Sequence, residues 1–162
     1  MIIDYYPSSE KRLSILDEYT PAQLEALTLE DLLGLYCGAD IPASQPQFDC
    51  LMSRIIACAP KRTGTRRKRL YRGTSRETMA AHGTGHSWTN NLDQAIKFAN
   101  FCVSFRYTNL FHTIDRRPIV IEHMFLPEEI ICKGNRGEDE WIVHAPHPDL
   151  CTILLKGHND NE

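Results

Sequence analysis

Apolar residues in the first third of the chain repeat at helical spacing, with start and stop signals between them. The segment Thr20–Gln23 combines an N-cap threonine, a proline in the first turn and a capping-box glutamine, which predicts a helix start. A second start at Thr28 predicts a helix that ends at Gly38. A third predicted helix opens at Ser44 and ends before Pro60. Its apolar residues share one face: Phe48, Leu51, Met52, Ile55 and Ile56.

After residue 65 the pattern changes to short strands and short helices. Residues 69–72 predict a strand that ends at Gly73, and Ser75 is placed to cap a short helix that Gly83 terminates. Residues 86–89 predict another strand, and Asn90 or Asn91 caps a longer amphipathic helix. Three further strands are predicted over residues 118–126, 138–144 and 151–156. Helices first and strands later indicate an α+β fold and not alternating βαβ units.

Length and composition narrow the class of protein. A chain of 162 residues suits one compact domain. No apolar run approaches the roughly 20 residues needed to span a bilayer, and residues 1–10 lack the order of a signal peptide. The six cysteines include no Cys-x-x-Cys pair, and no cysteine lies at ligand spacing from His82 and His86 or from His144 and His147. We therefore expect a cytoplasmic protein with free thiols and no metal.

Charge is distributed unevenly along the chain. Lys and Arg number 18 and Asp and Glu number 21, a formal net charge of −3. The stretch Lys61–Arg76 nevertheless holds eight basic residues and no acid. Such a cluster is compatible with a nucleic-acid patch, a phosphate site or a solvated linker, and the sequence leaves these readings open.

Two glutamates stand out at the start of the strand predicted over residues 138–144. Residues two apart on a strand share a face, so Glu138 and Glu140 are expected to point the same way. The glycines on either side of Asn135-Arg136 predict a flexible loop just before them. In a pair of carboxylates, one can stabilise positive charge while the other accepts or donates a proton. Acids at a solvated strand end are the common alternative.

Two earlier strands carry further polar candidates. Arg72 lies in an apolar strand, where an unpaired charge is costly, so it should meet a carboxylate or a phosphate. Gly73 directly after it would allow a ligand to approach the backbone. Ser87 and Thr89 share a face and can orient carboxylate or ribose oxygens. A structural salt bridge for Arg72 explains its presence equally well.

Taken in order, the arginine strand, the Ser87-Trp88-Thr89 strand with its following helix and the Glu138-Asp139-Glu140 strand resemble the mono-ADP-ribosyltransferases of the arginine–serine–glutamate class. This group includes cholera and C2/iota-type toxins. The blocks Leu70–Ser75 and Asp93–Ala99 are similar to bacteriophage Alt/Mod-type enzymes. The resemblance covers about residues 66 to 156. It implies an N-terminal helical region over residues 1–65 and a catalytic core over residues 66–157, built as a split antiparallel β-sandwich.

The resemblance also implies an activity, namely transfer of ADP-ribose from NAD to a protein side chain with release of nicotinamide. Glu140 would stabilise the reacting ribose and hold its 2′-hydroxyl, and Glu138 would act on the acceptor, usually arginine. Arg72 would bind the phosphate or ribose region of NAD, and the Gly73 backbone its carboxamide. Ser87 would position Glu140, with support from Thr89. Arg106, Arg116 and Arg117 are further candidates for the pyrophosphate.

A phage-type enzyme of this kind would act in the host cytosol on host proteins such as the transcription or translation machinery. Two departures from the family pattern leave the target open: Trp88 replaces the usual central residue of a Ser-Thr-Ser motif, and the loop before Glu138 lacks an aromatic. The competing readings are an NAD glycohydrolase, a catalytically inactive fold that binds a partner, and a nucleic-acid-binding module that uses residues 61–69. Only one aromatic residue, Tyr71, is interleaved with the basic residues, so the sequence offers few rings on which the bases of a nucleic acid could stack.

Overall fold

The computed structural model describes residues 15–38, 45–102, 117–135 and 139–156. The chain divides into two compact units, Met1–Ala59 and Pro60–Glu162. This division lies six residues before the boundary expected between the helical region and the core. The two units are described separately below.

The first unit is helical. It contains a 3-10 turn, η2 (Ile15–Glu18), and the helices α1 (Pro21–Glu25), α2 (Leu29–Gly38) and α3 (Gln45–Cys58). Thr20 caps α1, and its capping box with Gln23 forms as predicted. The side chains buried in the unit come from all four elements: Leu16, Leu24, Leu32, Leu33, Tyr36, Leu51, Met52 and Ile55. The predicted start of α3 at Ser44 lies outside the described residues.

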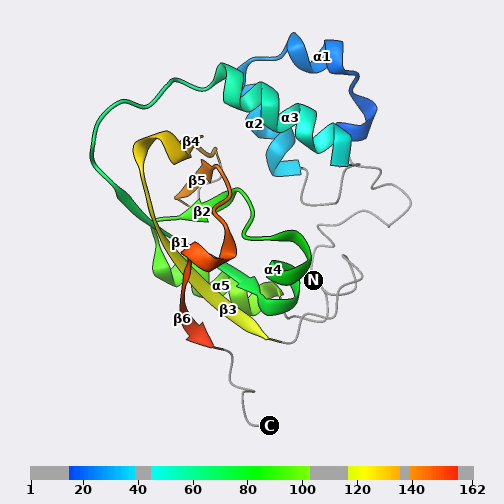
Figure 1. Ribbon diagram of the computed structural model, residues 1–162. Coiled ribbons are helices and arrows are strands. Elements are labelled where there is room, and N and C mark those ends of the chain that lie inside the picture. Colours follow the sequence, from blue (N-terminus) through cyan, green and yellow to red (C-terminus); the bar gives the residue numbers. More distant parts are fainter. Residues whose placement is uncertain (1–14, 39–44, 103–116, 136–138, 157–162) are drawn as a thin grey trace, which may run out of the picture. The chain divides into compact units, whose positions relative to one another are not determined.

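The second unit combines strands with short helices (Figure 1). In chain order the elements are β1 (Lys68–Ser75), α4 (Arg76–His82), β2 (Ser87–Thr89), α5 (Leu92–Cys102), β3 (Pro118–Phe125), η3 (Pro127–Glu129), β4 (Ile130–Lys133), β5 (Glu140–Val143), η4 (Pro148–Leu150) and β6 (Thr152–Lys156). Ser75 caps α4 and Gly83 ends it, as the sequence predicts. Asn91 caps α5, because its Oδ1 accepts a hydrogen bond from the Gln94 N–H at 3.1 Å. The predicted α+β class is confirmed.

The strands form one antiparallel sheet in the order β4-β5-β2-β1-β3-β6. β1 and β3 pair along eight residues, from Lys68 opposite Phe125 to Ser75 opposite Pro118. In contrast, β1 and β2 share a single register pair, Tyr71 opposite Thr89. The sheet therefore consists of two three-stranded halves, β4-β5-β2 and β1-β3-β6, that meet at this one pair.

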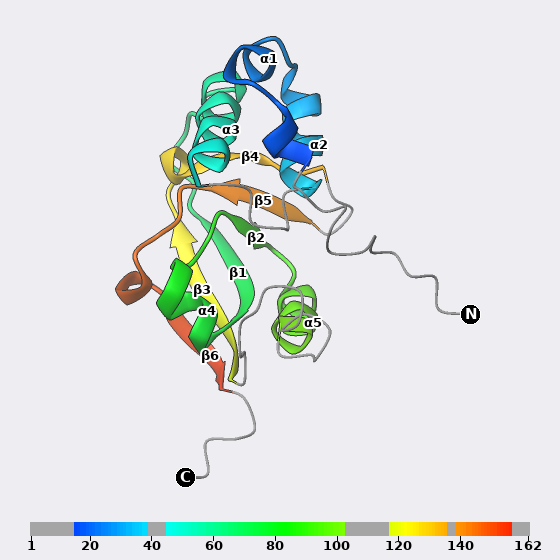
Figure 2. The ribbon, with the colours of Figure 1, turned by 90° about the vertical axis from the view of Figure 1, so that its right-hand side faces the viewer.

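Both faces of β1 are covered, because successive strand residues point to opposite sides. Leu70 belongs to the larger core cluster with Trp88, Ile121 and Phe125, and Met79 of α4 packs against it. On the other face, α5 packs through Ala95 and Ala99 onto Val120 and Tyr71. Figure 2 shows α4 and α5 on the two sides of β1 and β3.

Gly73 explains how closely α5 approaches β1. A Cβ at residue 73 would lie directly on the backbone of Ala95 and Ala99. Only glycine permits this contact between strand and helix, which gives Gly73 a packing role that is independent of any ligand.

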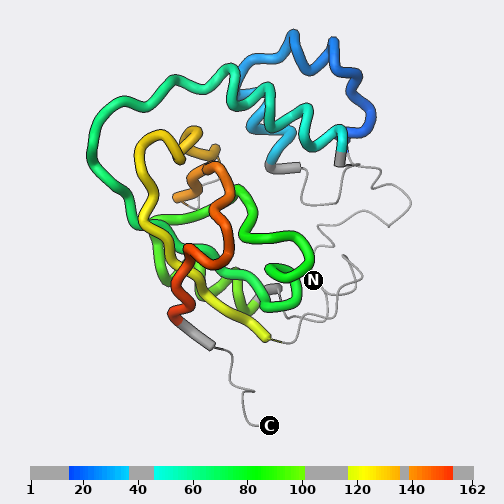
Figure 3. Tube along the Cα trace, viewed as in Figure 1, coloured from blue at the N-terminus to red at the C-terminus, as the bar shows by residue number. Residues whose placement is uncertain are grey.

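Three strand predictions differ from the structure. β1 does not end at Gly73 but continues to Ser75, because Gly73 and Thr74 remain paired with Val120 and Ile119 of β3. The chain turns after β3 through η3 into β4 and returns as β5, a path that Figure 3 follows, and β4 was not predicted. Its four residues are too few to show alternation. β5 begins at Glu140 and not at residue 138, because Asp139 has a left-handed φ of 53° that ends the extended backbone. Over the described ranges, no helix is both long and apolar enough to cross a membrane.

Candidate active site

Three strands bring the side chains of Arg72, Ser87 and Glu140 together around β2. The Ser87 hydroxyl donates a hydrogen bond to Oε1 of Glu140. The Arg72 guanidinium donates from Nη1 to the backbone carbonyl of the same serine. Ser87 therefore joins the cation from β1 to the anion from β5, through its backbone on one side and its side chain on the other.

The two charged groups are only partly satisfied by the protein. Glu140 is 3% exposed, and its Oε2 has no hydrogen-bond partner among the residues that the structure describes. The same holds for the buried Nε of Arg72. Buried polar atoms are nearly always paired, because an unmade hydrogen bond costs about 1–3 kcal/mol. An anionic acceptor and a cationic donor left unsatisfied beside one serine are typical of a site that a polar ligand completes.

Two glycines press against these charged groups. A Cβ on Gly134 would lie 2.8 Å from both Cγ and Cδ of Glu140, and closer still to its Oε2. A Cβ on Gly85 would lie 2.8 Å from Nη2 of Arg72. Gly85 also has a φ of 69°, which few other residues adopt. Each glycine therefore makes room for a catalytic candidate, and the sequence predictions assigned neither this role. Gly134 was noted in the sequence as one of two glycines flanking Asn135-Arg136, but these glycines were interpreted as a sign of loop flexibility.

β2 is held in place on both sides of the serine. The Val143 N–H donates to the His86 carbonyl at 2.9 Å, and the His86 ring Nδ1 bonds the Val143 carbonyl at 2.8 Å. Trp88 is buried, and its indole N–H donates to the Gly85 carbonyl at 3.0 Å. The core thus anchors β2 through Trp88, while Ser87 on its opposite face reaches Glu140.

The remaining predicted residues have other surroundings. Thr89 is buried opposite Glu140 in the register of β2 and β5, and its hydroxyl accepts a hydrogen bond from the Asn91 N–H at 3.1 Å. This bond ties Thr89 to the start of α5. Gly73 follows Arg72 on β1, where it packs under α5 as described above.

Glu138 lies outside the described residues, as do Arg106 and Arg116. The expectation that residues 138 and 140 share a face therefore stays a prediction. The described strand β5 begins at Glu140, directly after Asp139 with its left-handed φ of 53°. Arg117, the third pyrophosphate candidate, pairs through Nε with Oε1 of Glu77 at 2.7 Å.

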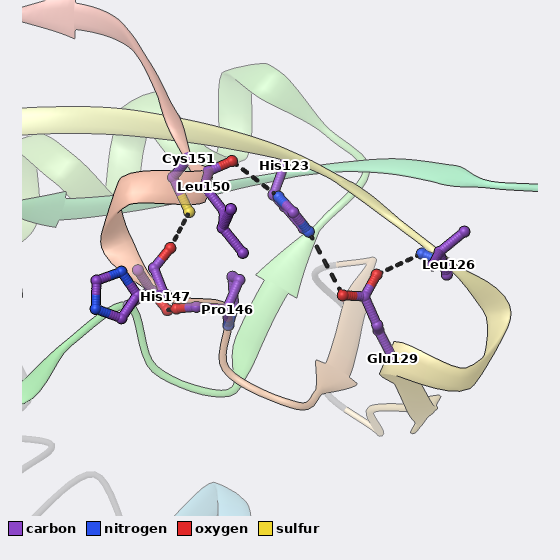
Figure 4. Close-up of polar contacts among 8 residues, drawn as sticks. His123, Leu126, Glu129, Pro146, His147, Leu150 and Cys151 are labelled. Atoms are coloured by element: carbon purple, nitrogen blue, oxygen red, sulfur yellow. Dashed lines mark hydrogen bonds and ion pairs between the residues drawn. The ribbon is translucent and has the colours of Figure 1, made fainter.

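A second polar cluster joins β3 to the loop before β6 (Figure 4). His123 Nδ1 bonds the Leu150 carbonyl at 3.1 Å, and its Nε2 lies 3.8 Å from Oε1 of Glu129. The other oxygen of Glu129 accepts a hydrogen bond from the Leu126 N–H at 2.6 Å. The Cys151 thiol donates to the His147 carbonyl at 3.8 Å. Most of these contacts end on backbone atoms, so the cluster is best explained as a structural one that holds η3 and the loop before β6 against β3.

The thiols of Cys132 and Cys151 in this unit have raised pKa values. Burial, with a smaller contribution from the charge of Glu140, raises the pKa of Cys132 to about 11. Burial raises the pKa of Cys151 to about 11 as well. Neither is a nucleophile at neutral pH. The part of the chain that the structure describes holds no group of three or more metal-ligating side chains.

Comparisons with known proteins add no relative: no protein-family model, no curated protein and no solved structure matches this chain. The function must therefore be argued from the site itself.

Proposed function

We propose that this protein transfers ADP-ribose from NAD to a protein side chain and releases nicotinamide. The observation that carries the proposal is the linkage of Arg72, Ser87 and Glu140 across three strands. A carboxylate oxygen and a guanidinium nitrogen of this linkage are buried without a hydrogen-bond partner among the described residues. The finer architecture, a split antiparallel β-sandwich of the ADP-ribosyltransferase type, belongs to the same proposal. This architecture is supported by the single register pair between β1 and β2 that connects the two halves of the sheet.

The chemistry of the donor explains why a fixed anion is needed. Cleavage of the bond between ribose and nicotinamide develops positive charge on the sugar, and nicotinamide leaves as a neutral base. A buried carboxylate already held in place stabilises this charge without reorganisation. Oε1 of Glu140 is fixed by Ser87, so Oε2 is the oxygen that meets the ribose and accepts a hydrogen bond from its 2′-hydroxyl.

Arg72 supplies the complementary charge. A guanidinium binds phosphate through two parallel hydrogen bonds, and Nε of Arg72 is a donor with no partner among the described residues. Within the described strands, β1 and β2 share no register pair beyond Tyr71. The backbone of Gly73 is therefore not paired with β2, which supports a contact between this backbone and the carboxamide of NAD. In this proposal Thr89 supports the network from its position opposite Glu140.

The acceptor is the least constrained part of the proposal. By resemblance, Glu138 orients and deprotonates an arginine side chain of a protein in the host cytosol, such as a component of transcription or translation. Water as acceptor would make the protein an NAD glycohydrolase. Product analysis separates the two, because hydrolysis yields free ADP-ribose and transfer yields labelled protein.

The proposal is tested with NAD labelled on the adenine-bearing half, incubated with a bacterial lysate and the protein. Glu140→Gln keeps the shape of the side chain but removes its charge, and Glu128→Gln is the matched control at an exposed glutamate on η3. We expect labelled protein with the parent chain and with Glu128→Gln, and little with Glu140→Gln. Equal labelling by all three, or by none, would contradict the proposal.

A further inference from the structure

Basic side chains gather around Trp141, on the segment before β1 and on β4. Cζ of Arg62 lies 4.7 Å from the centroid of the Trp141 ring, and Nζ of Lys68 lies 4.1 Å from it. Lys133 is the register partner of Trp141 on β4. We call this group the Trp141 patch; it comprises Arg62, Arg66, Lys68, Lys133 and Trp141.

The patch concentrates charge of one sign. Residues 61–67 are all exposed, and no acid occurs between Lys61 and Arg76. Burial lowers the pKa of Lys68, and the nearby charges of Arg62, Arg66 and Lys133 lower it further. The cations are thus close enough to repel one another. An anionic ligand would relieve this repulsion.

The structure also supplies an aromatic ring that the basic segment lacks in sequence. Proteins that bind single strands commonly stack the bases on aromatic side chains. Trp141 reaches the patch from β5, more than 70 residues after Arg69. Its indole N–H is buried with no hydrogen-bond partner in the described ranges.

The patch is separate from the candidate active site. Glu140 and Trp141 are consecutive on β5, so their side chains leave opposite faces of the strand. Glu140 turns toward Ser87, whereas Trp141 packs on the side of Trp88 and the larger core cluster. A ligand on the patch therefore does not compete with one beside Glu140.

We propose that the Trp141 patch binds the backbone of a single-stranded nucleic acid, with Arg62 and Lys68 moving from the indole to phosphates and a base stacking on the half-buried ring in their place. The exchange is inexpensive for Arg62, because a cation–π contact made by an exposed side chain is weak. Phosphate contacts replace it and release counterions from the strand. RNA and DNA share this chemistry, so the test includes both.

The test is fluorescence anisotropy of labelled single strands of about a dozen nucleotides, a length within the usual site size for such surfaces. RNA and DNA of the same sequence are compared with a duplex and with inorganic polyphosphate. We expect saturable binding of a single strand, with log affinity falling against log salt at a slope of about −3 for four phosphate contacts. A preference for RNA or for DNA identifies the source of the strand.

Matched charge reversals locate the surface. Arg66→Glu should weaken binding about tenfold, whereas Lys97→Glu, an equal change on the exposed side of α5, should leave it unchanged. Trp141→Leu should weaken single-strand binding but not polyphosphate binding. Glu140→Gln should bind like the parent chain, so failure of the transferase proposal leaves this result intact. No saturable binding at low salt, equal effects of Arg66→Glu and Lys97→Glu, or an unchanged affinity in Trp141→Leu would overturn the proposal.

Discussion

The Ser87 hydroxyl donates a hydrogen bond to Oε1 of Glu140 and leaves Oε2 of that carboxylate buried without a partner in the described structure. One oxygen of Glu140 is thus bonded within the protein, and the other is the oxygen that we propose binds the ribose. Because the serine carbonyl also receives the Arg72 guanidinium, a shift of Ser87 would displace both charged groups. This relationship leads to the first prediction.

Ser87→Ala should reduce nicotinamide release from NAD by about 10-fold to 100-fold. The carboxylate remains but loses the hydrogen bond that orients it, and misplacement of a catalytic group typically costs this much. Ser53→Ala, at an exposed serine on α3, is the control and should have no effect. Initial rates of nicotinamide release measure both. Equal rates for Ser87→Ala and the parent would show that Ser87 does not position Glu140.

Gly134→Ala should impair activity more than stability. The added methyl group would lie against the Glu140 carboxylate, which must move because the backbone around residue 134 is held by a 2.8 Å hydrogen bond from its N–H to the Glu140 carbonyl. We expect at least a tenfold loss of rate. Gly34→Ala on α2, where a methyl group meets nothing within 4 Å, should keep full activity. Full activity in Gly134→Ala would show that the carboxylate tolerates displacement.

Gly73→Ala should instead destabilise the fold of the second unit. Its methyl group meets the backbone of Ala95 and Ala99, and backbone atoms cannot move aside as a flexible side chain can. We expect the free energy of unfolding to fall by about 3 kcal/mol, the upper part of the range for overpacking. Urea denaturation followed by circular dichroism measures the change. A loss below about 0.5 kcal/mol would mean that α5 does not press on β1 as described.

The raised pKa of the Cys132 thiol has two consequences. The native protein should react slowly with thiol reagents at pH 8 at this residue, and the peptide that contains it should be labelled rapidly in urea. The folded pKa of about 11 exceeds the ordinary thiol pKa of 9.0, so the unfolded chain loses its proton first. Stability from this group is complete below pH 9 and is lost as the pH rises toward 11.

Mass spectrometry of alkylated peptides measures the labelling at Cys132. Because the charge of Glu140 contributes to the raised pKa, Glu140→Gln should lower the pKa of this thiol and speed its labelling at high pH. Rapid labelling of the native parent at pH 8 would contradict the burial of Cys132.

Local signals in the sequence predicted the elements well, and long-range contacts account for what it missed. Thr20, Ser75 and Asn91 mark helix starts because an N-cap acts within three residues. The close approach of α5 to Gly73 depends on residues more than 20 positions away, and no local pattern indicates it. The left-handed Asp139 likewise moved the start of β5 to Glu140.

In the candidate site, too, the sequence predicts the residues but not the long-range contacts between them. Arg72, Ser87 and Glu140 could be selected from residue type and order, but their linkage through Ser87 is visible only in the folded sheet. Gly85 was missed because its contact with Arg72 joins the loop before β2 to β1, 13 positions away in the sequence. The basic segment also lacked an aromatic partner in sequence, and Trp141 supplies one only after β5 pairs with β4.

The most direct test of the account is nicotinamide release from NAD by the purified protein and by Glu140→Gln, with and without a bacterial lysate as the source of acceptor. Chromatography quantifies nicotinamide, and circular dichroism verifies that both chains are folded. The account predicts release by the parent chain and a loss of about 100-fold or more in the variant. Absence of release by the folded parent under all conditions, or equal release by both chains, would contradict it.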